Sequence, residues 1–174
     1  QIETAQEVKR GVMQQLFTFG VAGEGAPTKL TSIGELPASW DVVQLGKVVL
    51  EAQYGLSDQA GSNGRYAILR MTNLVDGYVD PSDMKYLDID EELFKKFQVG
   101  RGDILFNRTN SPDLVGKTAI FDLEGQFTFA SYIIRLVLDK TRLEPHYLNF
   151  HLNTREAQGR LKSLATQGVS QSNI

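Results

Sequence analysis

Residues 102–138 read GDILFNRTNSPDLVGKTAIFDLEGQFTFASYIIRLVL, and this stretch indicates the fold class. Runs of Ile, Leu, Phe, Val and Thr alternate with polar breaks that contain Gly, Pro and Asn, which is typical of short strands joined by turns. No long helix separates these runs, so a doubly wound parallel sheet is not expected. The predicted strands are 102–106, 118–121, 127–130 and 132–138, with a polar loop over 107–113.

The flanking sequence extends this pattern and adds short helices. The apolar runs predict strands over 40–45, 48–50 and 66–71, a loop over 51–65 and an Asp-Gly turn at 76–77. Capping and periodicity signals predict helices over 90–97, from Pro145 to Leu152, and over 157–164. We therefore expect an α+β fold with a mixed or antiparallel β-sheet and short helices, carried on an N-terminal helix.

The first twenty residues predict a helix with one apolar stripe, which Lys9 interrupts. The stripe has the alternating three- and four-residue spacing of a coiled coil, and fewer than three heptads need a partner to be stable. The partner could be the chain's own domain or a helix outside this chain. We therefore expect a piece of a longer protein, with a spacer helix over 1–20, a linker over 21–38 and a globular domain over 39–174. The predicted interface residues are Ile2, Ala5, Val12, Leu16 and Phe19.

Composition excludes several classes of protein. The 174 residues include 41% hydrophobic and 22% charged residues, which is ordinary for a globular domain and unlike a disordered or collagen-like chain. The absence of cysteine excludes disulfides and cysteine-bound metals. The net charge of −3 gives no support to non-specific binding of nucleic acid, which usually needs a basic surface.

A search for catalytic groups finds no convincing constellation. The acidic run 88–92 fits the start of a helix better than a metal site. His146 and His151 are five residues apart, whereas two metal ligands on one helix face lie three or four apart. Asp83 and Lys85 could belong to a Mg²⁺-dependent nuclease, which stays as a less favoured alternative that a cleavage assay with and without Mg²⁺ would test. We expect no catalytic residue, no metal and no cofactor.

Two polar segments could contact nucleic acid. Residues 107–111 follow a predicted strand and lie close to Lys117. Arginine offers a planar fork of donors to phosphate or guanine, and asparagine can pair with adenine. The alternative is a turn whose Asn and Ser side chains bond to their own backbone. Residues 53–57, together with Arg65 and Arg70, form a second segment of this kind.

Several segments, in this order and spacing, resemble the target recognition domain of the DNA specificity subunit of type I restriction–modification enzymes. The longest is 102–121, and the others are 34–37 with Trp40, Val43 and Leu45, then 53–57, 66–74, 130–135 and 168–174. The resemblance implies two recognition domains in the whole subunit, separated by paired spacer helices that bind two methylation subunits. It implies that each domain reads one half of a split DNA target and that methylation and cleavage belong to other subunits.

The resemblance also implies partners. These are double-stranded DNA, the methylation subunits, the restriction subunit bound through them, and a second spacer helix, in the cytoplasm of a prokaryote. The isolated chain could pair with a second copy through its N-terminal helix. An alternative is the recognition domain of a fused methyltransferase–nuclease enzyme. Only sequence before Gln1 would distinguish that enzyme from a type I specificity subunit.

Positions shared with relatives that read other DNA sequences cannot carry this chain's own specificity. Arg108, Thr109, Asn110 and Lys117 are therefore assigned to phosphates or to shaping the loop, and Arg108 in particular is expected to bind phosphate. Base readers are expected where the resemblance is weakest, over 58–65 and 77–85. The candidate DNA-binding residues are Gln53, Tyr54, Ser57, Asn63, Arg65, Arg70, Asn73, Arg108, Thr109, Asn110, Ser111, Lys117, Ser131 and Tyr132.

Overall fold

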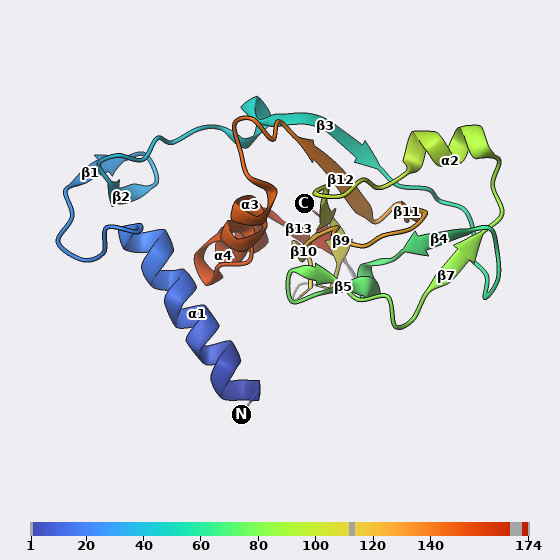
Figure 1. Cartoon of the computed structure of the whole chain (residues 1–174), viewed down its shortest axis with the longest axis horizontal. Coiled ribbons are helices and arrows are strands. Elements are labelled where there is room, and N and C mark those ends of the chain that lie inside the picture. Colours follow the sequence, from blue (N-terminus) through green and yellow to red (C-terminus); the bar gives the residue numbers. More distant parts are fainter. Residues whose placement is uncertain (1, 112–113, 168–171, 174) are drawn as a thin grey trace. The chain divides into compact units, whose positions relative to one another are not determined.

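The computed structural model describes residues 2–111, 114–167 and 172–173 (Figure 1). The chain divides into two compact units, residues 1–47 and 48–174. No helix in the described part is long and apolar enough to cross a membrane.

The first unit contains the predicted helix and a hairpin. Helix α1 (Ile2–Phe19) ends at Gly20, which has a φ of 68° and donates its N–H to the Leu16 carbonyl at 3.0 Å. This left-handed conformation is typical of a glycine that ends a helix. Strands β1 (Thr28–Thr31) and β2 (Gly34–Pro37) then pair antiparallel, so part of the segment that we interpreted as a linker is a hairpin. The strand expected over 40–45 does not form, and a 3₁₀ turn covers Leu45–Lys47.

The second unit is built on a six-stranded mixed sheet with the order β3-β12-β8-β10-β6-β5. All neighbours in this sheet pair antiparallel except β10 and β6. Its strands are β3 (Val49–Tyr54), β12 (Ile133–Leu138), β8 (Ile104–Asn107), β10 (Thr118–Ile120), β6 (Tyr78–Val79) and β5 (Leu74–Val75). The α+β fold class is therefore confirmed.

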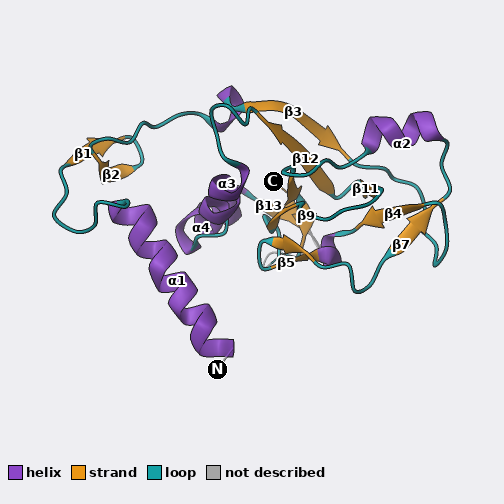
Figure 2. Cartoon of the chain, in the orientation of Figure 1, coloured by secondary structure: helices purple, strands orange, loops and turns teal. Residues whose placement is uncertain are grey.

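Two three-stranded sheets complete the second unit, and strands make up most of its ordered structure (Figure 2). In one, β4 (Tyr66–Leu69) lies between β11 (Phe127–Phe129), which is parallel to it, and β7 (Lys85–Leu87), which is antiparallel. Figure 1 shows β4 and β7 running side by side in opposite directions. In the other sheet, β14 (Ser172–Asn173) lies between β13 (Thr166–Gln167) and β9 (Thr109–Asn110).

Strand β3 differs from the prediction because it continues to Tyr54, where we expected a loop. It is an edge strand with mostly exposed side chains, so it lacks the apolar alternation that marks a half-buried strand. Its partner β12 lies about 80 residues further along the chain, so the pairing that extends β3 to Tyr54 forms only in the folded protein. Strands β7 and β9 were not predicted for the same reason, since each is short and depends on a distant partner.

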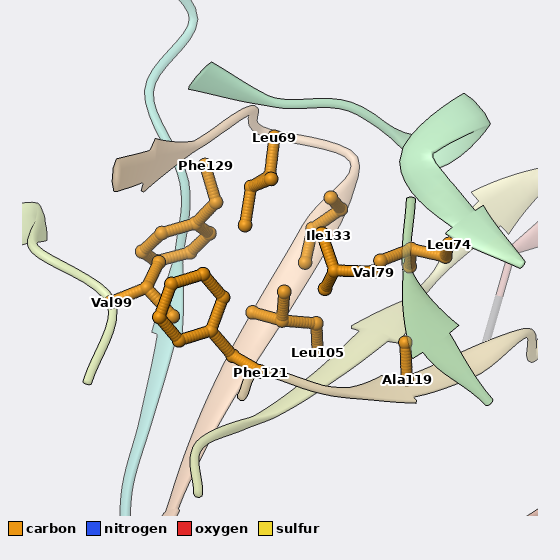
Figure 3. Packing of buried hydrophobic residues seen from close by; sticks show 9 residues of the cluster. All are labelled: Leu69, Leu74, Val79, Val99, Leu105, Ala119, Phe121, Phe129 and Ile133. Atoms are coloured by element: carbon orange, nitrogen blue, oxygen red, sulfur yellow. The ribbon is translucent and has the colours of Figure 1, made fainter. Parts of the chain in front are cut away.

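The largest core cluster lies between the six-stranded sheet and the β11-β4-β7 sheet. Its members come from both sheets and from the segments between them (Figure 3): Leu69, Leu74, Val79, Val99, Leu105, Ala119, Phe121, Phe129 and Ile133. Burial of one such side chain stabilises a fold by roughly 1.5–3 kcal/mol, so this cluster ties the two sheets together. A second cluster, with Ile104, Ile120 and Leu138, packs against Leu148 of helix α3 (Pro145–Leu152).

The predicted helices form and have capping groups at their first turns. Asp90 accepts a hydrogen bond from the Leu93 N–H at 2.7 Å and begins α2 (Glu91–Phe97), which confirms the cap interpretation of the acidic run. Glu144 caps α3 through the Tyr147 N–H at 2.8 Å. Thr154 caps α4 (Arg155–Leu164) through the Ala157 N–H at 3.2 Å.

Candidate nucleic-acid interface

Four segments that are distant in sequence meet at one edge of the β11-β4-β7 sheet. The Ala130 N–H donates to the Leu69 carbonyl at 2.9 Å, and the Ser131 N–H donates to the Leu56 carbonyl at 2.8 Å. Leu56 forms a parallel bridge with Ala130, and β4 is parallel to β11, so the residues that follow Leu56, β4 and β11 lie at the same edge of the sheet. Because β7 is antiparallel to β4, the residues that precede β7 lie at this edge too. We call this set the polar edge: Tyr54, Ser57, Arg70, Asp83, Arg108, Ser131 and Tyr132.

Arg108 is held in place at the polar edge by three contacts. Its backbone N–H donates to the Tyr132 carbonyl at 3.0 Å, and its side-chain Nε donates to the Ser131 carbonyl at 3.4 Å. The guanidinium carbon lies 5.0 Å from the centroid of the Tyr54 ring, within the range of a cation–π contact. Strand pairing sets this geometry. Ile134 of β12 pairs with Tyr54 of β3 on one side and with Phe106 of β8 on the other, and Arg108 lies two residues after Phe106.

The half-buried Arg108 has no carboxylate partner among the described residues, and its two terminal nitrogens make no hydrogen bond there. Other arginines of this unit form ion pairs: Arg65 with Glu91, Arg70 with Asp83, Arg101 with Asp122, Arg135 with Glu51, and Arg160 with Glu156. A positioned guanidinium without an internal anion suits an external one, because its fork of donors matches phosphate oxygens.

The turn that contains Asp83 is braced from the end of β4. Arg70 donates from one terminal nitrogen to the Asp83 carbonyl and carboxylate, both at 2.8 Å. Asn73 donates its amide N–H groups to the carbonyls of Asp80 and Asp83, both at 3.0 Å. The hydrogen bond and charge of Arg70 lower the pKa of the exposed Asp83 carboxyl, so it stays ionised.

Asn73 is only 2% exposed, and it also accepts the Arg70 N–H at 2.9 Å. Thr109, which is 4% exposed, lies in β9. These burials place the side chains of Asn73 and Thr109 inside the fold, so in this structure neither is positioned to contact a base, contrary to expectation. Gln53 is also engaged within the fold, since its amide donates to the Lys96 carbonyl at the end of α2 at 3.1 Å.

Asn63 and Arg65 lie away from the polar edge. Arg65 precedes β4 and Arg70 follows it, so the strand separates these two arginines. Arg65 pairs with Glu91 at 3.7 Å and stacks on the Tyr66 ring at 5.0 Å. The structure therefore divides the candidate residues between two ends of one small sheet.

The remaining candidates flank the loop that carries Arg108. The carbonyl of Ser111 accepts the N–H groups of Leu114 and Val115, and half-buried Lys117 accepts the Asn107 N–H through its carbonyl at 2.8 Å. The side chain of Asn110 lies outside the described residues.

Comparison with known proteins shows where the chain belongs. No family model matches it. The type I restriction enzyme MjaX specificity subunit of Methanocaldococcus jannaschii is 32% identical over 151 residues, which is 84% of this chain and 35% of that protein. The StySPI specificity subunit of Salmonella potsdam is 27% identical over 99% of this chain and 38% of that protein. The chain belongs to the type I specificity-subunit family.

Solved structures agree on the fold. The HsdS subunit from Thermoanaerobacter tengcongensis matches 98% of this chain with a TM-score of 0.57 and 18% identity, over 39% of its own length. A chain from a structure of the type I R-M system matches 90% of this chain with a TM-score of 0.58 and 17% identity, over 35% of its length. The resemblance inferred from sequence is confirmed, and this specificity-subunit segment spans about a third of the relatives that it matches.

Two residues of this specificity-subunit segment lie within the candidate segments 107–111 and 53–57, but sequence analysis did not predict their structural roles. Asn107 is fully buried, and its backbone binds Lys117 and Gly116, so it fixes the start of the Arg108 loop. Gly55 lies so close to 129–130 that a Cβ would meet both carbonyl oxygens and lie 2.6 Å from the Ala130 carbonyl carbon. The only sequence signal for each was its place beside a strand end. That signal does not distinguish a residue that supports the fold from inside from one that lies on the surface.

A motif near the C-terminal end of the sequence meets one from its middle in three dimensions. Ser172 pairs with Asn110, and Asn173 pairs with Thr109, so these two residues of the C-terminal motif form a sheet with the loop that follows Arg108. Gln158 of α4 donates to the Gly116 carbonyl at 2.9 Å and supports the same loop from helix α4.

Proposed function

We propose that this chain binds double-stranded DNA and reads one half of a bipartite target, as the recognition segment of a type I specificity subunit. The observation that carries the proposal is Arg108, which is positioned by Tyr54 and Ser131 and has no carboxylate partner in the described part of the chain. Phosphate contacts position a protein on DNA, and base contacts give specificity. Arg108 binds a phosphate, and the neighbouring Asp80–Asp83 turn approaches the bases.

The chain itself performs no chemistry in this proposal. It directs methylation subunits, and through them the restriction subunit, to a DNA site in the cytoplasm of a prokaryotic cell. A Mg²⁺-dependent nuclease that uses Asp83 and Lys85 is disfavoured, because Arg70 already holds Asp83. In addition, the described residues contain no group of three His, Cys, Asp or Glu side chains that could hold a metal ion.

An exchange of recognition segments tests this function. Residues 48–174 are replaced, within the natural full-length protein, by the matching segment of a relative such as the EcoKI specificity subunit, and methylated sites are mapped by sequencing. We expect one half of the methylated motif to change to that of the donor while the other half is retained. A motif that keeps both halves after the exchange contradicts the proposal.

The exposed face of α1 supports the proposed partner helix. Val8, Val12 and Leu16 are 61%, 49% and 44% exposed, Ala5 is exposed, and Phe19 is half-buried. The side chain of Ile2 lies outside the described residues. Val12, Leu16 and Phe19 line a hollow together with Gln15 and residues 20, 21, 23 and 24. Val8 was absent from the predicted stripe, although it lies four residues before Val12 on the same face.

We expect the purified chain to associate weakly with a second copy through this face, because exposed apolar helix residues favour burial. The double variant Val12→Glu, Leu16→Glu should be monomeric in sedimentation equilibrium at concentrations where the wild type is partly dimeric. Leu50→Glu is the matched control, since Leu50 is 70% exposed and lies in β3, outside the helix and the hollow. Association that survives the double variant would assign the contact to another surface.

A further inference from the structure

The Asp83 carboxylate is an unusual group for a surface that faces DNA, because phosphates repel it. It is 74% exposed as a side chain, yet Arg70 fixes it in one position. Oδ2 receives the hydrogen bond from Arg70, while Oδ1 makes no hydrogen bond within the described part of the chain. A fixed carboxylate oxygen in this setting offers one strong hydrogen-bond acceptor to whatever approaches the polar edge.

The backbone around Asp83 is equally constrained. The carbonyls of Asp80 and Asp83 are bound by Asn73, and the Asp80 N–H donates to the Asn73 carbonyl at 2.8 Å. The Ser82 N–H donates to the Asp80 carboxylate at 2.9 Å, which closes the turn on itself. Because the brace uses backbone groups and buried Asn73, it holds Asp83 without covering Oδ1.

The distance between Asp83 and Arg108 suits one DNA groove. Ser131, which binds Arg108, follows β11, while Asp83 precedes β7, and β4 lies between these two strands. Neighbouring strands lie about 4.8 Å apart, so the axes of β11 and β7, which lead to Ser131 and from Asp83, are separated by roughly 10 Å. The major groove is about 12 Å wide, so a phosphate at Arg108 and a base edge at Asp83 can belong to the same groove.

We infer that Asp83 determines specificity by accepting a hydrogen bond from the exocyclic amino group of a cytosine or adenine in the half-site, with Arg70 as its positioning residue. The inference rests on the proposed function. A carboxylate can only accept, and the amino groups of cytosine and adenine are the donors that the major groove presents. The Arg70 charge offsets the repulsion by phosphates that would otherwise oppose this contact.

The test uses the full-length protein assembled with its methylation subunit, and competition binding to the mapped target and to every single-base-pair variant of the half-site. For Asp83→Asn, which keeps the size of the side chain, we expect discrimination to fall about tenfold or more at one position that carries C or A, with the other positions unchanged. Affinity for unrelated DNA should not fall, because a negative charge has been removed.

Base analogues identify the group that is read. Duplexes with purine in place of adenine, or 2-pyrimidinone in place of cytosine, lack the exocyclic amine at one chosen position. The wild type should lose affinity for one of these duplexes. Asp83→Asn should lose none further, because Arg70 occupies its single amide oxygen and leaves toward the base an NH2 group, which cannot accept a hydrogen bond. Asp83→Glu keeps the charge and should also lose discrimination, whereas a merely electrostatic role would tolerate it.

Asp122→Asn is the matched control, since Asp122 is another exposed, arginine-paired carboxylate, held by Arg101 away from the polar edge. Unchanged discrimination in Asp83→Asn and Asp83→Glu, or an equal loss in Asp122→Asn, would overturn the inference while leaving the proposed function intact. A wild-type complex that shows no discrimination in the half-site that the segment exchange assigns to this chain would overturn both.

Discussion

Replacement of Gly55 by alanine is expected to lower the free energy of unfolding by at least about 3 kcal/mol, which is a large part of the stability of an ordinary domain. The new Cβ would overlap the backbone carbonyls of Phe129 and Ala130. Neither carbonyl can move easily, because the Phe129 carbonyl accepts the Leu56 N–H at 2.9 Å and Ala130 lies on the chain between β11 and β12. Chemical denaturation followed by circular dichroism measures the loss.

Gly159→Ala is the control for this substitution, because nothing lies within 4 Å of a Cβ at Gly159 in α4. Alanine in a helix interior is more stable than glycine, so this variant should gain up to about 1 kcal/mol. If Gly55→Ala is as stable as the wild type, the close approach of 55–57 to β11 is wrong, and with it the assembly of the polar edge.

Replacement of Arg108 by alanine is expected to weaken DNA binding by the assembled enzyme about tenfold, for all sequences alike. A charged hydrogen bond to phosphate contributes roughly 1.5–3 kcal/mol, and phosphate contacts do not depend on the base. The slope of log K against log salt concentration should fall by about one unit, because one fewer counterion is released. Filter binding or fluorescence anisotropy over a range of salt concentrations measures both effects.

Tyr54→Leu should produce a smaller loss of the same kind, because it removes the ring beneath the guanidinium and leaves the charge. Arg101→Ala is the matched control, since Arg101 is paired with Asp122 and belongs to neither the polar edge nor the Arg108 loop. A changed methylation motif with unchanged general affinity in Arg108→Ala would show that Arg108 reads a base instead.

Local sequence signals predicted much of the fold. The Asp76-Gly77 turn forms between β5 and β6 with φ angles of 50° and 87°, as an Asp-Gly hairpin signal predicts. Asp90 begins α2, and Pro145 lies in the first turn of α3. These signals succeed because each depends on residues within one turn of the chain. The family resemblance was also carried by short motifs in order, and the relatives confirm it.

The candidate site was predictable only in part. Tyr54, Arg108, Ser131 and Tyr132 were named as candidates from the sequence, and the structure brings them together. Their contact with DNA stays a prediction. Asn73 had the same signal and is buried, because its amide matches two carbonyls that only the folded turn provides. A side chain that binds its own backbone and one that awaits a ligand have the same sequence signature.

The sequence by itself therefore determined the fold class, the helices with their caps, the Asp-Gly turn, and the family to which the chain belongs. Tertiary structure alone decided that β3 pairs with β12 and that β14 pairs with β9. It also decided that Arg70 holds Asp83, while the terminal nitrogens of Arg108 make no hydrogen bond within the described residues. The physical reason is the range of the interactions. Turn and cap preferences act over a few residues, whereas strand pairing and burial join residues tens of positions apart and settle which polar groups find partners within the fold.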